Sequence, residues 1–399
     1  MSERDLALLE YVAIRNETKV DYKVWEELNN IGAIGFHDFP DIADLKRISE
    51  EYYTRLSGRT SLLIDDAVGS SPKVKEAALR YAEFADRGNI RIIPRDSDLY
   101  PRIWRYLSGM PPVLFLKGDP DVLREVDNNG GAAIVGSRDP GRYSLYATRE
   151  FSQALSERNV VIVSGMALGI DRNAHEACMA NNGRTIAVLP GGCDVIYPYH
   201  NRDTYERICQ TGAVVSEMPP GHDVIKQYFP SRNRLISALS DVCLIMEAGK
   251  RSGTLHTASF AANQGKDVFV LPNSIYVDNC IGGLNLLRDG AEVLIDVETV
   301  YERIQKEVEN RRLLCGDYPE EPDLDFFREM MKVDPEHLSE GAWKAVICDE
   351  ISEKPRNIDE LCNCLGIPFT YLSSIITMLE TEGLIANERG KYVLTIQKG

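Results

Sequence analysis

The sequence is short of positive charge. Its 399 residues include 45 Lys and Arg against 61 Asp and Glu, so the net charge is −16 at pH 7. A protein that coats nucleic acid needs Lys and Arg over its whole surface to neutralise phosphates, and this balance excludes that class. Residues 131–300 are nearly balanced, with 15 Lys and Arg against 18 Asp and Glu, which leaves room for a local basic groove.

Long apolar runs and paired cysteines are missing as well. No stretch of about 18 apolar residues occurs, so we expect no membrane span and no membrane partner. The start, MSERDLALLE, is charged and lacks the apolar core of a signal peptide, which favours a cytoplasmic protein. The nine cysteines are scattered, and the closest two, Cys362 and Cys364, would face different sides of a helix. We expect reduced, buried thiols and no metal site.

Two nucleotide-binding fingerprints are absent. Residues 132–147, AAIVGSRDPGRYSLYA, start like a dinucleotide-binding fold, with an apolar strand before a glycine turn. The full Gly-x-Gly-x-x-Gly pattern is absent, since Arg138 stands where its second glycine would be, and no acidic residue ends the next strand to bind a ribose. The Walker A pattern is missing too, so we expect no NAD, no P-loop nucleotide and no other cofactor.

The chain begins instead with helical patterns. Apolar residues recur at spacings of three and four along residues 6–15, 24–32 and 42–58. We predict a small helical, SAM-like domain over residues 1–78, with a further helix at residues 74–89.

Short apolar strands then alternate with helices. Near-continuous apolar strands between helices predict a mostly parallel sheet that is covered on both faces. We predict an α/β fold with an extended Rossmann-like sheet over residues 79–307. The expected strands are residues 90–93, 113–116, 132–135, 160–164, 185–189, 213–217, 242–247, 267–271 and 291–295.

The C-terminal part has a different character. Residues 308–338 are polar and acidic and predict a flexible linker. Residues 339–399 contain three helical patterns and then two strands, the order of a winged-helix domain. Its expected third helix, residues 369–382, has no Lys or Arg and contains Glu380 and Glu382, so it lacks cations for phosphate contacts. We favour a protein-contact or regulatory role for this domain over duplex binding.

Five successive strands end in Gly, Ser or small polar residues. Parallel strands end at one edge of a sheet, where the following helices present unpaired N–H groups to anions. These loops therefore predict a phosphate-binding rim, although tight strand-to-helix turns need Gly and Ser even without a ligand. The rim residues are Gly136, Ser137, Arg138, Ser164, Gly165, Arg232, Arg234, Arg251, Ser252 and Gly253.

Asp171 and His175 are four residues apart and share one helix face. A catalytic interpretation makes His175 a base that Asp171 orients. A structural interpretation makes Asp171 a helix cap and His175 an internally bonded side chain. No nucleophile motif accompanies the pair, so we favour the structural interpretation and predict no catalytic residue.

A set of motifs runs in order through the middle of the chain. They are AIVGSR, SGMALGIDRNAH, AVLPGGCDVIYPYHN, SEMPPG, FPSRNRLISALS, EAGKRSGTLHTA and GGLNLLRDGA. In that order they resemble the bacterial DNA-processing proteins of the DprA (Smf) family, over about residues 90–295. The resemblance implies a single-stranded DNA-binding protein that forms a homodimer through its Rossmann domain and loads the RecA recombinase in natural transformation.

The resemblance also assigns roles to particular positions. It makes Arg138 a phosphate ligand and adds Lys226 and Phe229, a cation and an aromatic face of the kind that single-strand sites use. A core aromatic packed beside Pro230 is the alternative for Phe229.

The FPSRNR motif supplies three further candidates. Arg232, Asn233 and Arg234 are expected to contact the DNA. For the two arginines, ion pairs with Glu217 or Glu247 are the alternative, and the sequence does not separate the two.

The chain departs from the family pattern at Leu168, His256 and Asn273, where the family has Arg, Ile and Gly. The loss of an arginine at Leu168 removes one cation from the rim.

Two other functions stay open. The PGG motif is similar to that of nucleotide phosphoribohydrolases, but CDVIYP follows it in place of their Gly-Thr and Glu. The winged-helix domain allows a transcription regulator.

Overall fold

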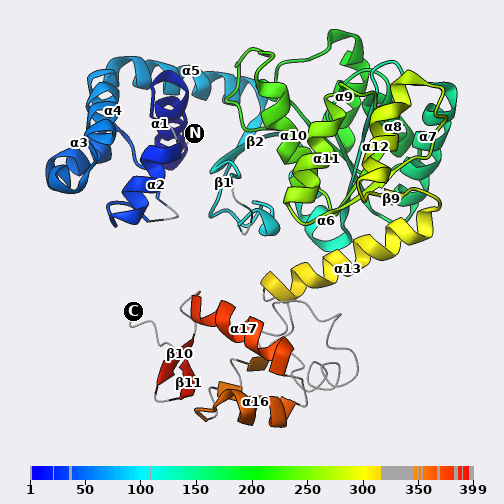
Figure 1. Cartoon of the computed structure of the whole chain (residues 1–399). Helices are drawn as coiled ribbons and strands as arrows, with labels where there is room; N and C mark the ends of the chain where they lie inside the picture. Colours follow the sequence, from blue (N-terminus) through cyan, green and yellow to red (C-terminus); the bar gives the residue numbers. More distant parts are fainter. Residues whose placement is uncertain are drawn as a thin grey trace. The chain divides into compact units, whose positions relative to one another are not determined.

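The computed structural model describes residues 2–20, 22–35, 38–105, 107, 109–315, 346–347, 350–351, 354–365, 369–381, 385–388 and 390–394. The chain forms two compact units, Met1–Gln305 and Lys306–Gly399, and each is described by itself. Figure 1 shows their helices and strands in the order of the sequence.

The described part of the first unit opens with five α-helices. The first begins at a capping box, in which the Ser2 hydroxyl accepts a hydrogen bond from the Asp5 amide and the Asp5 carboxylate accepts one from the Ser2 amide. Asp41 and Asp44 form the same reciprocal cap before the third helix. The elements are α1 (Glu3–Glu17), α2 (Tyr22–Asn30), α3 (Ile42–Glu51), the 3-10 helix η1 (Tyr53–Arg55), α4 (Gly58–Gly69) and α5 (Ser71–Gly88).

A nine-stranded sheet follows within the described residues of this unit. Its strand order is β1-β2-β6-β5-β4-β3-β7-β8-β9. β2 is antiparallel to both β1 and β6, and the other neighbouring pairs are parallel. The bounds are β1 (Ile90–Pro94), β2 (Val113–Gly118), β3 (Gly131–Gly136), β4 (Val161–Ser164), β5 (Thr185–Val188), β6 (Ala213–Ser216), β7 (Val242–Glu247), β8 (Asp267–Val270) and β9 (Glu292–Val293).

Helices cover both faces of this sheet (Figure 1). α7, α8 and α9 pack side by side on one face, and α6, α10, α11 and α12 contribute apolar side chains to the core on the other face. The bounds are the 3-10 helix η2 (Arg102–Arg105), α6 (Asp121–Asn129), α7 (Arg142–Glu157), α8 (Ile170–Ala180), the 3-10 helix η3 (Tyr199–Asn201), α9 (Arg202–Thr211), α10 (Tyr228–Ala238), α11 (Thr254–Asn263), the 3-10 helix η4 (Asp278–Cys280) and α12 (Ile281–Arg288).

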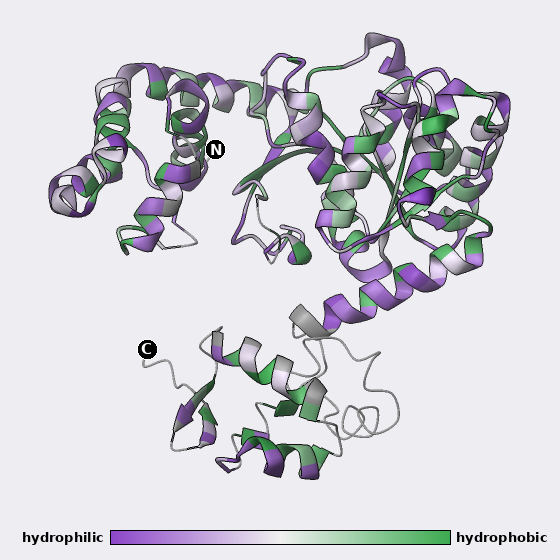
Figure 2. Cartoon of the chain, in the orientation of Figure 1, coloured by the Kyte–Doolittle hydropathy of each residue, from purple (hydrophilic) through white to green (hydrophobic). Residues whose placement is uncertain are grey.

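The central strands are buried on both faces because helices cover both. Every residue of β4, β5 and β7 is buried. Figure 2 shows this pattern, with hydrophobic residues along the strands and hydrophilic residues on the outer helix surfaces. The sequence therefore has near-continuous apolar runs at these strands rather than an alternating pattern.

The strand order reverses at β3. The chain adds β4, β5 and β6 on one side of β3 and then returns to place β7, β8 and β9 on the other side. The loops that leave the neighbouring strands β3 and β7 lead to helices on opposite faces, which opens a crevice between them at the carboxyl edge.

The second unit is described in part. α13 (Val297–Cys315) leads into it, followed by α16 (Ile358–Leu365), α17 (Phe369–Thr381) and the antiparallel pair β10 (Ile385–Glu388) and β11 (Lys391–Leu394). Its described residues include one buried apolar cluster, formed by Val346, Ile347, Ile351, Leu361, Leu365, Leu372, Ile376, Leu379 and Ile385. The winged-helix assignment stays a prediction.

The α/β class and the mostly parallel sheet are confirmed, and two boundaries differ from prediction. α5 starts before residue 78 and runs past it, because one apolar cluster extends from the N-terminal helices through α5 to the sheet. The linker expected from residue 308 is helical as far as Cys315, since α13 continues. Residues 316–338 lie outside the described residues.

Phe115 tests that shared cluster. It is fully buried in β2 and belongs to the cluster that also contains the N-terminal helices. Phe115→Ala should lower the free energy of unfolding by about 3–5 kcal/mol, because it leaves a cavity. Urea unfolding measures the loss, and Leu62→Ala, at a side chain 71% exposed on α4, should change stability by less than about 0.5 kcal/mol. Equal losses would show that Phe115 does not support the core.

Candidate functional site

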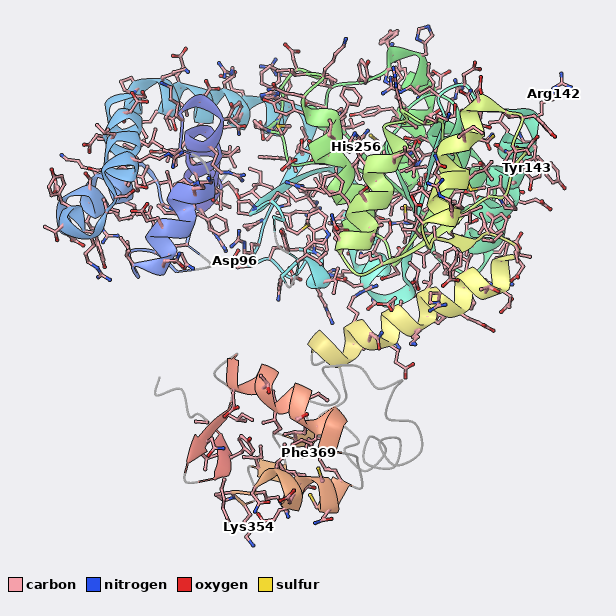
Figure 3. The ribbon with its side chains drawn as sticks, in the orientation of Figure 1. Asp96, Arg142, Tyr143, His256, Lys354 and Phe369 are labelled. Atoms are coloured by element: carbon pink, nitrogen blue, oxygen red, sulfur yellow. The ribbon has the colours of Figure 1, made fainter. Side chains whose placement is uncertain are left out.

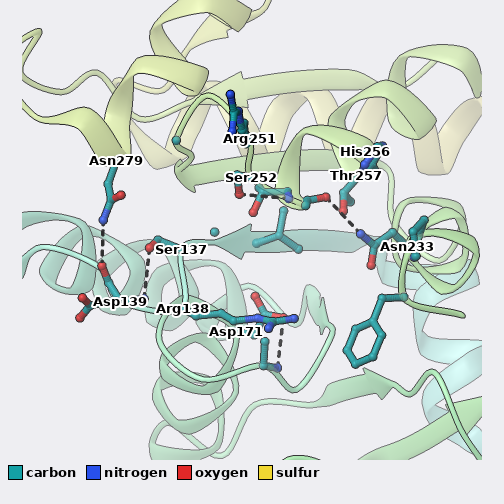
Figure 4. Close-up of a pocket in the computed structure, with 18 of the residues that line it drawn as sticks. Ser137, Arg138, Asp139, Asp171, Asn233, Arg251, Ser252, His256, Thr257 and Asn279 are labelled. Atoms are coloured by element: carbon teal, nitrogen blue, oxygen red, sulfur yellow. Dashed lines mark hydrogen bonds between the residues drawn. The ribbon is translucent and has the colours of Figure 1, made fainter. Parts of the chain in front are cut away.

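A pocket of about 860 Å³ lies in the crevice between the ends of β3 and β7. Residues 135–139 line it on one side, and residues 249–254, with His256 and Thr257 from α11, line it on the other. Figure 3 labels His256 on α11, and Figure 4 shows Ser137, Arg138 and Asp139 across the pocket from Arg251, Ser252 and His256. The pocket is therefore built at the edge where the sequence predicts a rim.

A close backbone contact fixes the loop after β3. The Ile170 amide, at the start of α8, donates a 3.1 Å hydrogen bond to the Ser137 carbonyl. Gly169 makes this approach possible because its φ is +79° and a Cβ there would lie 2.4 Å from the Ser137 carbonyl oxygen. The loop that carries Arg138 is thus held against the start of α8.

Arg138 extends into the pocket from this loop. Its guanidinium carbon lies 5.6 Å from the centre of the Phe229 ring, which is partly exposed at the start of α10. No hydrogen bond or ion pair to this guanidinium occurs within the described residues, and the side chain is exposed. A cation stacked on an aromatic face is ordered but keeps its N–H donors free.

Arg232 lies beneath that pair. It is buried, and its Nη1 donates to the carbonyls of Gly165, at 2.8 Å, and Val188, which follow and end the neighbouring strands β4 and β5. Its guanidinium carbon is 5.9 Å from the same Phe229 ring. Burial lowers the pKa of Arg232 to about 10, so the side chain stays charged at neutral pH.

The Asp171 carboxylate lies close to this buried cation. It accepts hydrogen bonds from the amides of Gly165, at 3.2 Å, and Ala167, at 3.3 Å. Burial raises the pKa of Asp171, although Arg232 and these amides oppose the shift. Asp171 therefore organises the loop after β4, while Gly169 occupies the N-cap of α8. The expectation that Asp171 caps its own helix is corrected, because its oxygens bind loop amides.

The loop after β7 supplies the opposite wall. The Ser252 hydroxyl accepts a 3.2 Å hydrogen bond from the Thr254 amide, and Asn233 donates a 3.3 Å bond to the Gly253 carbonyl. These bonds place the N-terminus of α11 at the pocket, where its amides favour an anion. Lys250 and Arg251 are exposed on the same loop.

The positions of the charged side chains on the pocket wall favour an anionic ligand more than their net charge does. Among the residues that the structure describes, the exposed cations have no hydrogen bond or ion pair, whereas one of the acids, Asp171, is buried and accepts hydrogen bonds from backbone amides. The charged lining residues are Arg138, Arg232, Lys250, Arg251, Asp139, Asp171 and Asp278.

Most of the predicted rim residues line this pocket. They are Gly136, Ser137, Arg138, Phe229, Arg232, Asn233, Arg251, Ser252 and Gly253. Lys226 is exposed but is not among the lining residues, and its contact with a ligand stays a prediction. Phe229 is a partly exposed pocket residue rather than a core aromatic.

Three predicted residues support the rim from outside it, which corrects the expectation. The Ser164 hydroxyl is buried and donates to the Ile134 carbonyl at 2.7 Å. Gly165 presents its carbonyl to Arg232. Arg234 forms a part-buried ion pair with Glu217 at 2.5 Å, which is the alternative that the sequence left open.

Sequence reasoning missed several lining residues. His256 and Thr257 lie on the first turns of α11, and Asp278 and Asn279 lie on η4, far along the chain. The side-chain Nδ2 of Asn279 donates a 3.4 Å hydrogen bond to the Asp139 carbonyl, so η4 closes one end of the pocket. Lys250 was in an identified loop, but nothing local in the sequence indicates that η4 reaches the same place.

His175 is an internal residue. It is fully buried on α8, and its Nδ1 lies 2.7 Å from the Thr185 hydroxyl, which donates to the Ile162 carbonyl and so accepts from Nδ1–H. Burial lowers the pKa of His175 to about 3. His175 is therefore a neutral, internally hydrogen-bonded side chain that carries its proton on Nδ1, which is the structural interpretation that the sequence favours.

Across the part of the chain that the structure describes, no three His, Cys, Asp or Glu side chains gather as a metal site. No helix among those residues is both long and apolar enough to span a membrane.

The comparison with known families decides the identity of this fold. The sequence model of the family described as DNA recombination-mediator protein A matches residues 91–305, which is more than half of the chain. The chain belongs to this family. The match runs from β1 into α13 and includes the whole pocket.

Individual proteins are also similar to this member of the recombination-mediator family. Protein Smf of Synechocystis is 34% identical over 78% of this chain and 81% of its own length. Protein Smf of Escherichia coli is 31% identical over 94% and 96% of the two chains. The crystal structure of DNA processing protein A from Streptococcus pneumoniae has a TM-score of 0.53 and 32% identity, covering 66% of this chain and 92% of that one.

Gly169 in this recombination-mediator fold offers a first test of the site. An added Cβ would meet the Ser137 and Arg138 carbonyl oxygens at 2.4 and 2.7 Å, and φ is +79°. Gly169→Ala should therefore lower the free energy of unfolding by more than about 3 kcal/mol. The control is Gly265→Ala, with φ of +71° and no atom within 4 Å, which should cost only about 1–2 kcal/mol in urea unfolding. Equal costs would mean that the backbone contact does not hold the loop.

His175 gives the protein a pH-dependent stability. In the unfolded chain its pKa is near 6.5, whereas in the fold it is about 3, so between these values the unfolded state binds the extra proton. Stability should fall as pH drops from 6.5, by up to about 1.4 kcal/mol per pH unit from this residue. His175→Gln should flatten the pH profile of urea unfolding in this window, and His200→Gln, at an exposed residue, should not. Parallel profiles for all three proteins would refute the assignment.

Proposed function

We propose that this chain binds single-stranded DNA in the pocket between β3 and β7 and acts as a recombination mediator. The observation that carries the proposal is the Arg138 guanidinium, exposed above the Phe229 ring with its donors free. A cation that takes a phosphate and an aromatic face that stacks a base are the two elements of single-strand recognition. DNA processing is also the role that the name of the Streptococcus pneumoniae relative states.

The shape of the site favours a single strand over a duplex. The pocket is concave, and Phe229 lies on its wall rather than on a raised surface. A base in a single strand is free to turn toward such a wall, whereas a duplex keeps its bases stacked inside and presents phosphates on a convex surface. The acidic chain as a whole discourages additional non-specific contacts.

The broader role follows from the family resemblance. We propose that the protein acts in the cytoplasm by binding rather than by catalytic turnover, that it forms a homodimer through the Rossmann domain over residues 79–307, and that it delivers the strand to the RecA recombinase. For residues 339–399 we propose a winged-helix domain with a protein-contact or regulatory role. The absence of Lys and Arg from α17 supports that choice over duplex binding.

Arg138→Ala tests the proposal. Wild type should bind fluorescent oligo-dT more tightly than the matching duplex, with an affinity that falls as salt rises. The variant should bind oligo-dT at least about tenfold more weakly, because a charge-assisted hydrogen bond is lost, and its salt slope should be shallower by about 0.7.

The matched control is Arg47→Ala, which removes an exposed arginine from α3 that pairs with Asp44 and Glu51. It lowers the net charge by the same amount and should leave the oligo-dT affinity unchanged. Equal binding of duplex and single strand, or equal affinities of wild type and the Arg138 variant, would refute the proposal.

A further inference from the structure

The exposed face of α7 carries two aromatic rings between two arginines. Tyr143 and Tyr146 are 53% and 62% exposed, and Arg142 and Arg149 are also exposed. Figure 3 shows Arg142 and Tyr143 projecting from the start of α7 into solvent. Because positions three and four apart share a helix face, Arg142, Tyr146 and Arg149 form one row, about 10 Å long at 1.5 Å per residue.

These side chains are unused by the fold. In the described chain, the Arg142 and Arg149 guanidinium groups have no hydrogen bond or ion pair, and the rings of Tyr143 and Tyr146 have no aromatic partner. Arg202 on α9, for comparison, is exposed and pairs with Glu206. Packing and helix stability therefore do not account for this row.

A second exposed apolar segment lies beside it. The loop between β8 and η4 presents Ile275 and Tyr276, which are 66% and 90% exposed. The Asn273 side chain donates a 3.3 Å hydrogen bond to the Ser144 hydroxyl on α7, which attaches the start of this loop to the helix. The start of this loop therefore lies against the buried side of the first turn of α7, the helix that carries the row.

The same elements border the pocket. α7 follows directly from the loop of Ser137 and Arg138, and the loop of Tyr276 runs into Asp278 and Asn279, which line the pocket. The hydrogen bond from Asn279 to the Asp139 carbonyl joins the two elements at the pocket rim. The exposed residues of α7 and of the loop that contains Tyr276 therefore adjoin the proposed site.

We propose that Arg142, Tyr143, Tyr146, Arg149 and Tyr276 form a second platform for single-stranded DNA, onto which the strand runs as it leaves the pocket. This inference rests on the proposed function and extends it to a longer binding site. Bases would stack on the tyrosines, and the two arginines would take phosphates. The alternation of rings and free cations fits this polymer better than it fits an apolar protein surface.

The acids near the platform set the expected balance of forces. Asp139 and Asp278 lie at the pocket rim, and Glu150 follows Arg149 on α7. The local charge is therefore close to neutral, and the arginines alone give only a modest attraction. Stacking on the three tyrosines is therefore expected to supply the larger part of the binding free energy at the platform. Removal of the rings should weaken strand binding more than removal of the arginine charges.

The experiment compares oligo-dT of several lengths, with wild type and two double variants. Tyr143→Ala/Tyr146→Ala should bind a long strand, such as dT20, about tenfold or more weakly than wild type. It should bind dT4, which the pocket alone accommodates, with unchanged affinity. Arg142→Ala/Arg149→Ala should lower the salt slope for dT20 by about 1.4 and leave the slope for dT4 unchanged.

The control variant is Tyr53→Ala, a 66% exposed tyrosine on η1, and it should match wild type at every length. Circular dichroism of each variant checks that the fold is intact. Equal affinities of wild type and both double variants for dT20, as expected if the face serves another protein, would overturn the platform. A loss that is equal for dT4 and dT20 would overturn it as well.

The failure of the proposed function gives a different result. In that case wild type itself would show no preference for oligo-dT, or Arg138→Ala would bind it normally. If Arg138→Ala weakens binding as predicted while the tyrosine variant binds every length as wild type does, the pocket remains as proposed and only the platform is overturned.

Discussion

The buried guanidinium of Arg232 is the interaction on which the rest of the site depends. It bridges the carbonyls of Gly165 and Val188, so one side chain fastens the carboxyl ends of two neighbouring strands. Its burial would be costly without such partners. Asp171 lies nearby and fixes the amides of the same loop, so charge and hydrogen bonding are satisfied together beneath the pocket. Above that base, Phe229 and Arg138 are free to face a ligand.

The arrangement separates cations that are bound within the fold from cations that are exposed at the pocket. Arg232 and Arg234 come from one short motif, yet the first binds carbonyls and the second pairs with Glu217. Arg138, Lys250 and Arg251 come from loops and remain exposed. Rigid elements therefore carry the buried charges, while the loops that follow β3 and β7 present the charges that a phosphate would meet.

Much of the fold follows from local patterns. The apolar runs and the glycine turns after them give the strands, the mostly parallel sheet and the edge at which its loops gather. Most of the rim follows as well, since loops after neighbouring parallel strands share one edge. How deeply each side chain is buried cannot be predicted from these local patterns. Ser164 ends β4 and Arg138 follows shortly after β3, and only the packed structure shows that the Ser164 hydroxyl points into the sheet and the Arg138 side chain into the pocket. η4 reaches the pocket through a contact more than a hundred residues apart in sequence, between Asn279 and Asp139, which no local pattern encodes.

The contact at Gly169 has a mechanical consequence. The first amide of α8 is bonded to the carbonyl of Ser137, with no side chain between them, so the arginine loop cannot leave the helix without breaking this hydrogen bond. A shift of the loop that carries Arg138 would therefore either break this bond or displace the first turn of α8, so the position of the guanidinium is coupled to the packing of that helix.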